Sequence, residues 1–359
     1  KMKKKDRMKI EPVDMPEQDP SKRVRNVNEV PTGYTAEMAM MEAKRCIQCK
    51  RPFCTEGCPV GIDIPGFIQL IEDGDFAGAV SKIKETNLLP AICGRVCPQE
   101  EQCQLTCTIG KFRKDPTLAV NIGRLERFLA DWERENGEVP LPPKPTPTGK
   151  KVAIVGGGPA GLTVAGDLIR QGHEVIVFEA FHKAGGVLIY GIPEFRLPKA
   201  IVQKEVDYLE QLGVQFKYNF VVGKTAPVQK IIDDHDAVFI GTGAGLPRFM
   251  KIPGENLLGV YSANEYLTRA NLMQAYSFPE TDTPLITGRS IATIGGGNVA
   301  MDCARTALRM GAKRSLIIYR RAEEQMPARI EEVHHAKAEG VEFHTLQNPL
   351  RFLGNDENW

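Results

Sequence analysis

Residues 148–180 and 287–321 read as two copies of one pattern: an apolar strand, a glycine-rich turn, a helix and a second apolar strand. The first copy contains "VAIVGGGPAGLTVAGDLIRQGHEVIVFEA" and the second "IATIGGGNVAMDCARTALRMGAKRSLIIYRR". A glycine fingerprint that follows a strand and opens a helix indicates a dinucleotide-binding unit. The two copies predict two Rossmann-like domains in series and place the chain in the α/β class.

Each glycine turn has the features that a pyrophosphate needs. Gly156 permits the tight turn, Gly158 lets backbone N–H groups approach the phosphates, and Gly161 allows helix and strand to pack closely. The start of the following helix adds partial positive charge. The predicted binding residues are Gly156, Gly158, Pro159, Ala160 and Gly161 in the first copy and Gly295, Gly297, Asn298, Val299 and Ala300 in the second.

The copies differ at the end of their second strand, where the ribose of a dinucleotide lies. The first ends in Glu179, whose carboxylate can accept hydrogen bonds from both ribose hydroxyls and would repel a 2′-phosphate. The second ends in Arg320 and Arg321, and guanidinium pairs well with phosphate. The first site is therefore predicted to take an unphosphorylated ribose and the second NADP(H). A solvated carboxylate and a surface basic pair are the alternatives.

Eight of the nine cysteines lie in the first third of the chain, in two groups: Cys46, Cys49, Cys54 and Cys58, then Cys93, Cys97, Cys103 and Cys107. The first group reads C-x2-C-x4-C-x3-C-P, close to a ferredoxin run in which the fourth cysteine serves a different cluster from the first three. Zinc favours two C-x2-C pairs on separate turns. We predict two 4Fe-4S clusters, with zinc or unligated structural thiols as alternatives.

The composition is that of an ordinary protein of 359 residues with a formal net charge of +1, which gives no reason to expect nucleic acid or a membrane as a partner. No apolar stretch of a signal peptide follows the basic start "KMKKKDRMK", and no apolar run is long enough to span a membrane. We therefore expect a cytoplasmic protein, in which thiols stay reduced and serve metals rather than disulfides.

These patterns predict the order of domains. Residues 1–137 are expected to form a helical domain whose short helices the clusters hold together. Five prolines between Pro140 and Pro147 indicate a stiff linker over 138–150. Residues 151–286 would hold the first nucleotide site and residues 287–359 the second.

The eight-cysteine domain and the motifs "VAIVGGGPAGLTVAGDL", "GGVLIYGIPEFRLPK", "GTGA" and "IGGGNVAMDCARTALRMGA" together resemble the glutamate synthase small-subunit family of iron-sulfur flavoproteins. The resemblance implies FAD in the first site and NADP(H) in the second. It adds flavin contacts from Gly186, Leu188, Tyr190, Gly191, Ile192 and Gly243, although a plain glycine turn is the alternative for Gly243. Family members continue past the point where this chain ends in "RFLGNDENW", so we expect the NADP domain and the flavin pocket to be incomplete as written.

The resemblance also implies crossed cluster ligation. One cluster would be held by Cys46, Cys49, Cys54 and Cys107. The other would be held by Cys58, Cys97, Cys103 and a side-chain oxygen from Glu126, with Cys93 as the alternative to Glu126.

Within the family, residues 259–284 look most like the large subunit of the electron-bifurcating NADH-dependent ferredoxin:NADP oxidoreductase. The implied function is electron transfer between NADP(H), FAD and the clusters, with no catalytic side chain because the cofactors carry the chemistry. The partner would be a second redox subunit that uses NAD(H), together with ferredoxin. The alternative is the small subunit of NADPH-dependent glutamate synthase, whose partner is the glutamate-forming large subunit.

Two readings outside the family are less favoured. A disulfide reductase needs a redox C-x-x-C beside the flavin, but no cysteine lies between Cys107 and Cys303. A structural zinc module with a vestigial flavin fold does not explain two intact glycine fingerprints. Cys303 is expected to be a buried apolar side chain, and His334 and His335 to be surface or hydrogen-bonded histidines.

Overall fold

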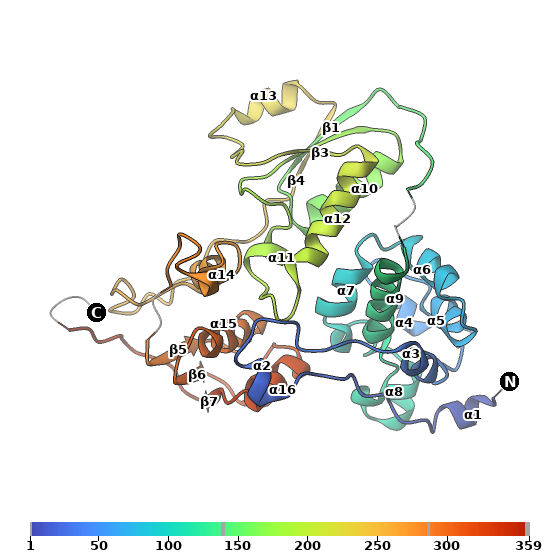
Figure 1. Ribbon diagram of the computed structural model, residues 1–359, viewed down its shortest axis with the longest axis horizontal. Coiled ribbons are helices and arrows are strands. Elements are labelled where there is room, and N and C mark those ends of the chain that lie inside the picture. Colours follow the sequence, from blue (N-terminus) through green and yellow to red (C-terminus); the bar gives the residue numbers. More distant parts are fainter. Residues whose placement is uncertain (1, 138–140, 286–287, 356–359) are drawn as a thin grey trace. The chain divides into compact units, whose positions relative to one another are not determined.

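The computed structural model describes residues 2–137, 141–285 and 288–355, and Figure 1 labels its helices and strands. The chain divides into two compact units. Unit 1 comprises residues 1–17 and 30–144, and unit 2 comprises residues 18–29 and 145–359. A stretch near the N-terminus, with helix α2 (Pro20–Arg23), therefore belongs to unit 2.

Unit 1 is built from short helices joined by the cysteine-containing loops. Aspartates cap two of the helices, since Asp63 accepts a 3.1 Å hydrogen bond from the Gly66 N–H and Asp75 a 2.9 Å bond from the Gly78 N–H. The helices are α1 (Lys4–Arg7), α3 (Ala36–Ala43), α4 (Phe53–Glu56), α5 (Ile64–Glu72), α6 (Phe76–Lys84), α7 (Pro90–Val96), α8 (Thr108–Arg113) and α9 (Ile122–Asn136), with 3-10 turns at Gln99–Glu101 and Pro116–Leu118.

The core of unit 1 joins α5 to α9. One face of α5 is fully buried because its apolar residues recur at helical spacing, and the face consists of Ile64, Phe67, Ile68 and Ile71. These side chains share one apolar cluster with Leu125, Phe128 and Leu129 of α9. Burying a side chain of this size contributes about 1.5–3 kcal/mol. The cluster also includes Cys103 and Cys107, so the core fixes part of the cysteine framework.

Unit 2 contains two parallel sheets, with strand orders β3-β2-β1-β4 and β5-β6-β7. The strands are β1 (Lys151–Val155), β2 (Glu174–Phe178), β3 (Gln215–Lys217), β4 (Ala237–Ile240), β5 (Ser290–Ile294), β6 (Arg314–Tyr319) and β7 (Glu342–Thr345). The helices are α10 (Pro159–Arg170), α11 (Val187–Tyr190), α12 (Lys199–Leu212), α13 (Val228–Asp233), α14 (Ala263–Asn271), α15 (Asn298–Arg309) and α16 (Ile330–Ala338), with 3-10 turns at Ala275–Ser277 and Glu323–Gln325.

The two sheets carry the two copies seen in the sequence. β1, α10 and β2 of the first copy recur as β5, α15 and β6 of the second, and in each copy the helix begins directly at the glycine turn. Ala153 and Ile154 of β1 and Val175 and Val177 of β2 are fully buried, as expected for inner strands of a parallel sheet. The register pairs Ile154 with Val177.

The predicted linker, residues 138–150, is described only in part. Residues 141–150 are exposed and form neither helix nor strand, while 138–140 lie outside the described residues. The predicted boundary between residues 286 and 287, and the last four residues, also lie outside them.

Candidate functional site

Three cysteines of the first group and one of the second line one pocket of unit 1. Cys46 and Cys49 come from the loop after α3, Cys54 from α4, and Cys107 precedes α8. Every cysteine of the chain is a free thiol. The pocket therefore gathers the four cysteines that the family resemblance assigns to one cluster.

Burial governs the acidity of these thiols. It raises the pKa of Cys46 to about 11 and that of Cys54 to about 12, and the negative charge of neighbouring thiolates adds to the effect. Four thiolates could share this pocket only beside a strongly positive centre, because their mutual repulsion would otherwise keep them protonated. The donor set thus fits a metal cluster.

The other predicted ligand set also lies together. The pKa of Cys103 is raised by burial and by the charges of Glu126, Cys58 and Cys97, so these four groups are electrostatic neighbours. Glu126 on α9 is only 5% exposed, and burial and Cys97 raise its pKa to about 8. A carboxylate on a helix is ordinarily exposed to water. A carboxylate that is buried beside thiols is better explained as a metal ligand.

Cys93, the alternative ligand, lies beside the same set. Its pKa is raised well above the ordinary value, first by a hydrogen bond with Cys97 and then by burial and the charge of Glu126. Cys93 Sγ also donates to Asn87 Oδ1 at 3.7 Å. Both candidates for the fourth position are therefore within reach of Cys97.

The first glycine turn of unit 2 is crowded by backbone. A Cβ on Gly156 would lie 2.4 Å from the Gly241 carbonyl oxygen, and a Cβ on Gly161 would lie 2.0 Å from the Gly156 carbonyl oxygen. A Cβ on Gly186 would lie 2.8 Å from Gly158 Cα. The turn thus packs closely against two other chain segments at positions where only glycine fits.

Glu179 lies at the base of this turn. It is 5% exposed, and its two carboxylate oxygens accept hydrogen bonds from the Gly157 N–H at 2.7 Å and the Phe181 N–H at 2.8 Å. Tyr190 is near enough that the charge of Glu179, after burial, raises the pKa of its hydroxyl. A carboxylate fixed beside the glycine turn is what a ribose site requires.

The remaining first-site residues lie at the start of α10, in the segment after β2 and after β4. Pro159 and Ala160 form the first turn of α10, and Leu188 and Gly191 are buried while Ile192 is half-buried. Gly243 follows β4 with φ of +71°, and a Cβ there would meet no atom within 4 Å.

The second glycine turn is bordered by the residues that follow β6. Asn298 Oδ1 accepts a 2.9 Å hydrogen bond from the Arg329 N–H, and the Gly296 carbonyl accepts a 3.2 Å bond from the Ala328 N–H. Gly295 has φ of +142°, which favours glycine. Arg320 and Arg321 are both exposed directly after β6.

The remaining second-site residues begin α15. Gly297 precedes it, and Val299 is exposed while Ala300 is buried. A Cβ on Gly295 would lie 3.4 Å from Ala300 Cβ, so the second turn accommodates alanine where the first has Gly161.

Two protein-family models match the chain, one over its first part and one over the rest. Residues 23–138 match the family model described as dihydropyrimidine dehydrogenase domain II, 4Fe-4S cluster. Residues 150–358 match the model for pyridine nucleotide-disulphide oxidoreductases.

Among curated proteins, the chain is 38% identical to the glutamate synthase [NADPH] small chain of Halomonas elongata, over 96% of this chain and 73% of that protein. It is 38% identical to the small chain of Escherichia coli, over 94% of this chain and 72% of that protein. The chain belongs to the glutamate synthase small-subunit family. The same comparison finds 36% identity to the beta subunit of the NADPH-Fe(3+) oxidoreductase of Geobacter sulfurreducens, over 85% of this chain and 44% of that protein.

Membership of the glutamate synthase small-subunit family confirms the predicted family and fold class, with an iron-sulfur domain before the nucleotide-binding domains. It also confirms that the chain is an iron-sulfur flavoprotein oxidoreductase. Among the helices of the described ranges, none is long and apolar enough to cross a membrane.

Cys303, which we expected to be a buried apolar side chain, is buried. Cys303 is 6% exposed, and burial raises the pKa of its thiol far above the ordinary value. His334 is exposed and His335 is buried.

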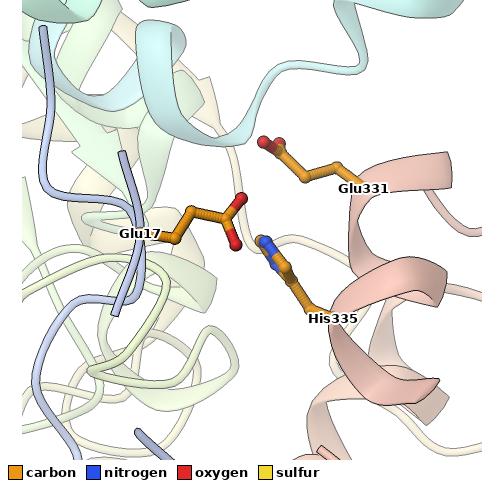
Figure 2. Close-up of side chains that lie close together, drawn as sticks. All are labelled: Glu17, Glu331 and His335. Atoms are coloured by element: carbon orange, nitrogen blue, oxygen red, sulfur yellow. The ribbon is translucent and has the colours of Figure 1, made fainter. Parts of the chain in front are cut away.

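Figure 2 shows Glu331 and His335 projecting from α16; Glu17, the third labelled side chain, belongs to unit 1. Glu331 accepts a 3.1 Å hydrogen bond from Arg329 Nη2, so this carboxylate has a structural partner.

Three polar residues near the flavin motif were not recognised in the sequence. Lys199 Nζ donates to the carbonyls of Leu188 at 2.9 Å, Leu197 at 3.0 Å and Ile192. Asn271 Nδ2 donates to the carbonyl of Tyr190 at 3.2 Å. The third residue is Arg196, whose partners are more than one hundred positions away. The two cations of "FRLPK" could have drawn attention to Arg196 and Lys199, but no local pattern marks Asn271.

Proposed function

We propose that this chain is an NADPH-dependent electron-transfer subunit of a larger enzyme, with FAD in the first nucleotide site and two 4Fe-4S clusters in unit 1. The observation that carries the proposal is the opposite charge at the two strand ends. Glu179 is buried beside the first glycine turn, whereas Arg320 and Arg321 are exposed at the second. A carboxylate suits an unphosphorylated ribose, and two guanidinium groups suit the 2′-phosphate of NADP(H).

The first turn fits FAD through its shape. The close approach of Gly158 and Gly186 leaves no side chain between the turn and the 184–199 segment, which we define as Ala184–Lys199. The N–H groups at the start of α10 and the Glu179 carboxylate would then hold pyrophosphate and ribose. When bound, FAD accepts two electrons as hydride from a nicotinamide and passes on single electrons.

In unit 1 the proposed ligand sets are supported by the effect of their neighbouring thiol and carboxyl groups on one another's pKa values. Cys46, Cys49, Cys54 and Cys107 would hold one 4Fe-4S cluster, and Cys58, Cys97, Cys103 and Glu126 the other, with Cys93 as the alternative. The apolar core around these residues limits the access of water, which lowers the dielectric around a cluster and tunes its potential.

The partner is proposed to be a glutamate-forming large subunit. The relatives named glutamate synthase small chain support this alternative better than electron bifurcation, which rests on residues 259–284 alone. We propose that the complex is cytoplasmic. Ferredoxin and an NAD(H)-using subunit would be the partners only if the enzyme bifurcates electrons.

The test is an anaerobic purification of the full-length native protein with analysis of iron, sulfide, zinc and flavin, followed by titration with NADPH and with NADH. We expect about eight iron atoms and one FAD per chain, and bleaching of the flavin by NADPH far more readily than by NADH. Zinc without sulfide would contradict the cluster assignment. Equal bleaching by NADH would contradict the role of the two arginines, and co-purification identifies the partner.

A further inference from the structure

Arg196 inserts a buried guanidinium between two helices of the second nucleotide fold. Its Nη1 donates to both carboxylate oxygens of Asp302, at 2.9 and 2.7 Å, and its Nε lies 3.0 Å from Glu332 Oε1. The three side chains are between 4% and 6% exposed. Asp302 lies on α15 and Glu332 on α16, so one arginine of the 184–199 segment binds both helices.

Phe195, the neighbouring residue, enters the same region. Its ring is 2% exposed, with the guanidinium carbon of Arg309 3.9 Å and that of Arg305 4.6 Å from the ring centroid. Cations above an aromatic ring attract its negative face. Two consecutive residues of the 184–199 segment are therefore held by the second nucleotide fold.

The rest of the 184–199 segment is tied internally, so a displacement of Arg196 would be passed along it. Lys199 Nζ binds the carbonyls of Leu188, Ile192 and Leu197, which span the segment. Gly186 packs against Gly158 of the first glycine turn. The segment thus joins the first turn directly to Arg196.

On the other side, Asp302 lies about one turn into α15, a helix that begins at Asn298 directly after the second glycine turn. A shift of α15 would move that turn and any nucleotide bound there. The pairs of Arg196 with Asp302 and Glu332 therefore connect the 184–199 segment, which packs on the first turn, to the helix that starts at the second turn.

We propose that Arg196 is a positioning residue that fixes the separation of the flavin and nicotinamide sites, an inference that rests on the proposed function. Hydride transfer needs the reacting atoms about 3–3.5 Å apart, and an error of about 1 Å can reduce the rate roughly a hundredfold. Buried ion pairs contribute little net stability compared with apolar packing, so a fixed geometry is the better reason for this network. Arginine suits the task because its planar fork serves two carboxylates at once, whereas lysine is a point charge.

The test compares the FAD- and cluster-loaded wild type with Arg196→Lys and with Asp302→Asn. Arg196→Lys keeps the buried charge, and Asp302→Asn keeps the shape of the side chain. The matched control is Ser315→Ala, which removes a buried 2.8 Å hydrogen bond from β6 to α15 without touching the 184–199 segment. Flavin reduction by NADPH is followed by anaerobic stopped flow, NADP⁺ affinity by equilibrium titration, and the melting temperature by calorimetry.

We expect the rate of flavin reduction to fall roughly 10- to 100-fold in both variants, with NADP⁺ affinity within twofold of wild type. The melting temperature should fall in Asp302→Asn, because this variant leaves a buried arginine with one carboxylate fewer, so all rates are measured well below the melting temperatures. Wild-type rates of flavin reduction in either variant would overturn the proposal and leave the proposed function intact. An equal loss of rate in Ser315→Ala would have the same meaning. A wild-type flavin that NADPH does not reduce would overturn the proposed function and this inference with it.

Discussion

Asn87 Nδ2 donates a 2.6 Å hydrogen bond to Glu126 Oε1, and both side chains are buried in unit 1. Asn87 Oδ1 accepts a weaker bond from Cys93 Sγ. One amide thus contacts both candidates for the fourth ligand of the second cluster. Hydrogen bonds from neighbouring groups hold metal ligands in position, so a carboxylate oriented in this way is typical of a metal ligand.

We predict that Glu126→Gln removes one cluster and that Cys93→Ser does not. Iron should fall from about eight to about four atoms per chain in Glu126→Gln, because an amide is a poor replacement for an anionic ligand. Iron and sulfide analysis with EPR of the reduced protein measures the change. Loss of one cluster in Cys93→Ser with full iron in Glu126→Gln would reverse the assignment.

Cluster retention should depend on pH. Burial raises the pKa of Cys46 to about 11, of Cys54 to about 12 and of Glu126 to about 8. Since these groups bind a metal only when deprotonated, protons compete with iron, and acidification favours the metal-free form. The iron retained against a fixed chelator concentration should therefore rise from pH 6.5 to pH 8.5. Anaerobic chelator titration at several pH values tests this, and retention independent of pH would contradict it.

The nucleotide folds could be predicted because their signals are local. The glycine turn, the helix behind it and the charge at the next strand end lie within about thirty residues, and the structure has β1, α10, β2 and β5, α15, β6 in those places. The gathering of the four pocket cysteines, in contrast, could not be predicted from a local signal. Spacing alone indicated clusters, but the meeting of Cys46 with Cys107 came from the family resemblance, since no local pattern joins residues so far apart.

Other contacts had no local signal at all. The pair of Arg196 and Asp302 depends on how α15 packs, which sequence periodicity does not specify. The same is true of residues 18–29, which belong to unit 2 although they precede the cysteine groups. Arg23 pairs with Glu339 at 2.9 Å, and the Asn26 carbonyl accepts a 3.0 Å bond from Arg309 Nε. A buried charge pair of this kind can be recognised only when both partners have been placed.

Gly161→Ala is predicted to destabilise the first nucleotide fold. The new Cβ would lie 2.0 Å from the Gly156 carbonyl oxygen, so the turn must shift. Overpacking of this kind costs about 1–3 kcal/mol, and FAD content should fall with it. The matched control is Ala300→Gly in the second turn, where the expected cost is at most about 1 kcal/mol from helix propensity. Thermal unfolding and flavin content measure both, and equal effects of the two substitutions would argue against a special role for Gly161.

Glu179→Gln is predicted to weaken FAD binding roughly tenfold, because hydrogen bonds to charged groups contribute about 1.5–3 kcal/mol and the amide keeps only part of this. The variant should also lose about 1–3 kcal/mol of stability, because its amide nitrogen cannot accept the second of the two backbone N–H bonds that the carboxylate accepts. Glu174→Gln is the control, as Glu174 is an exposed residue of the same strand that pairs with Lys151 at 3.3 Å. FAD titration of the flavin-free protein gives the affinity, and unchanged binding in Glu179→Gln would remove Glu179 from the ribose site.

The last prediction concerns the choice between NADPH and NADH. Replacing Arg320 or Arg321 by alanine should lower kcat/KM for NADPH roughly 10- to 100-fold, because each charge-assisted bond to a phosphate contributes about 1.5–3 kcal/mol. The value for NADH should change little, since NADH lacks the 2′-phosphate. Arg314→Ala is the control, because Arg314 is exposed at the start of β6, the strand that ends just before Arg320, and pairs with Glu342 at 2.7 Å. A parallel loss with both nucleotides would mean that the arginines stabilise the fold, and no loss with either would leave them as a surface basic pair.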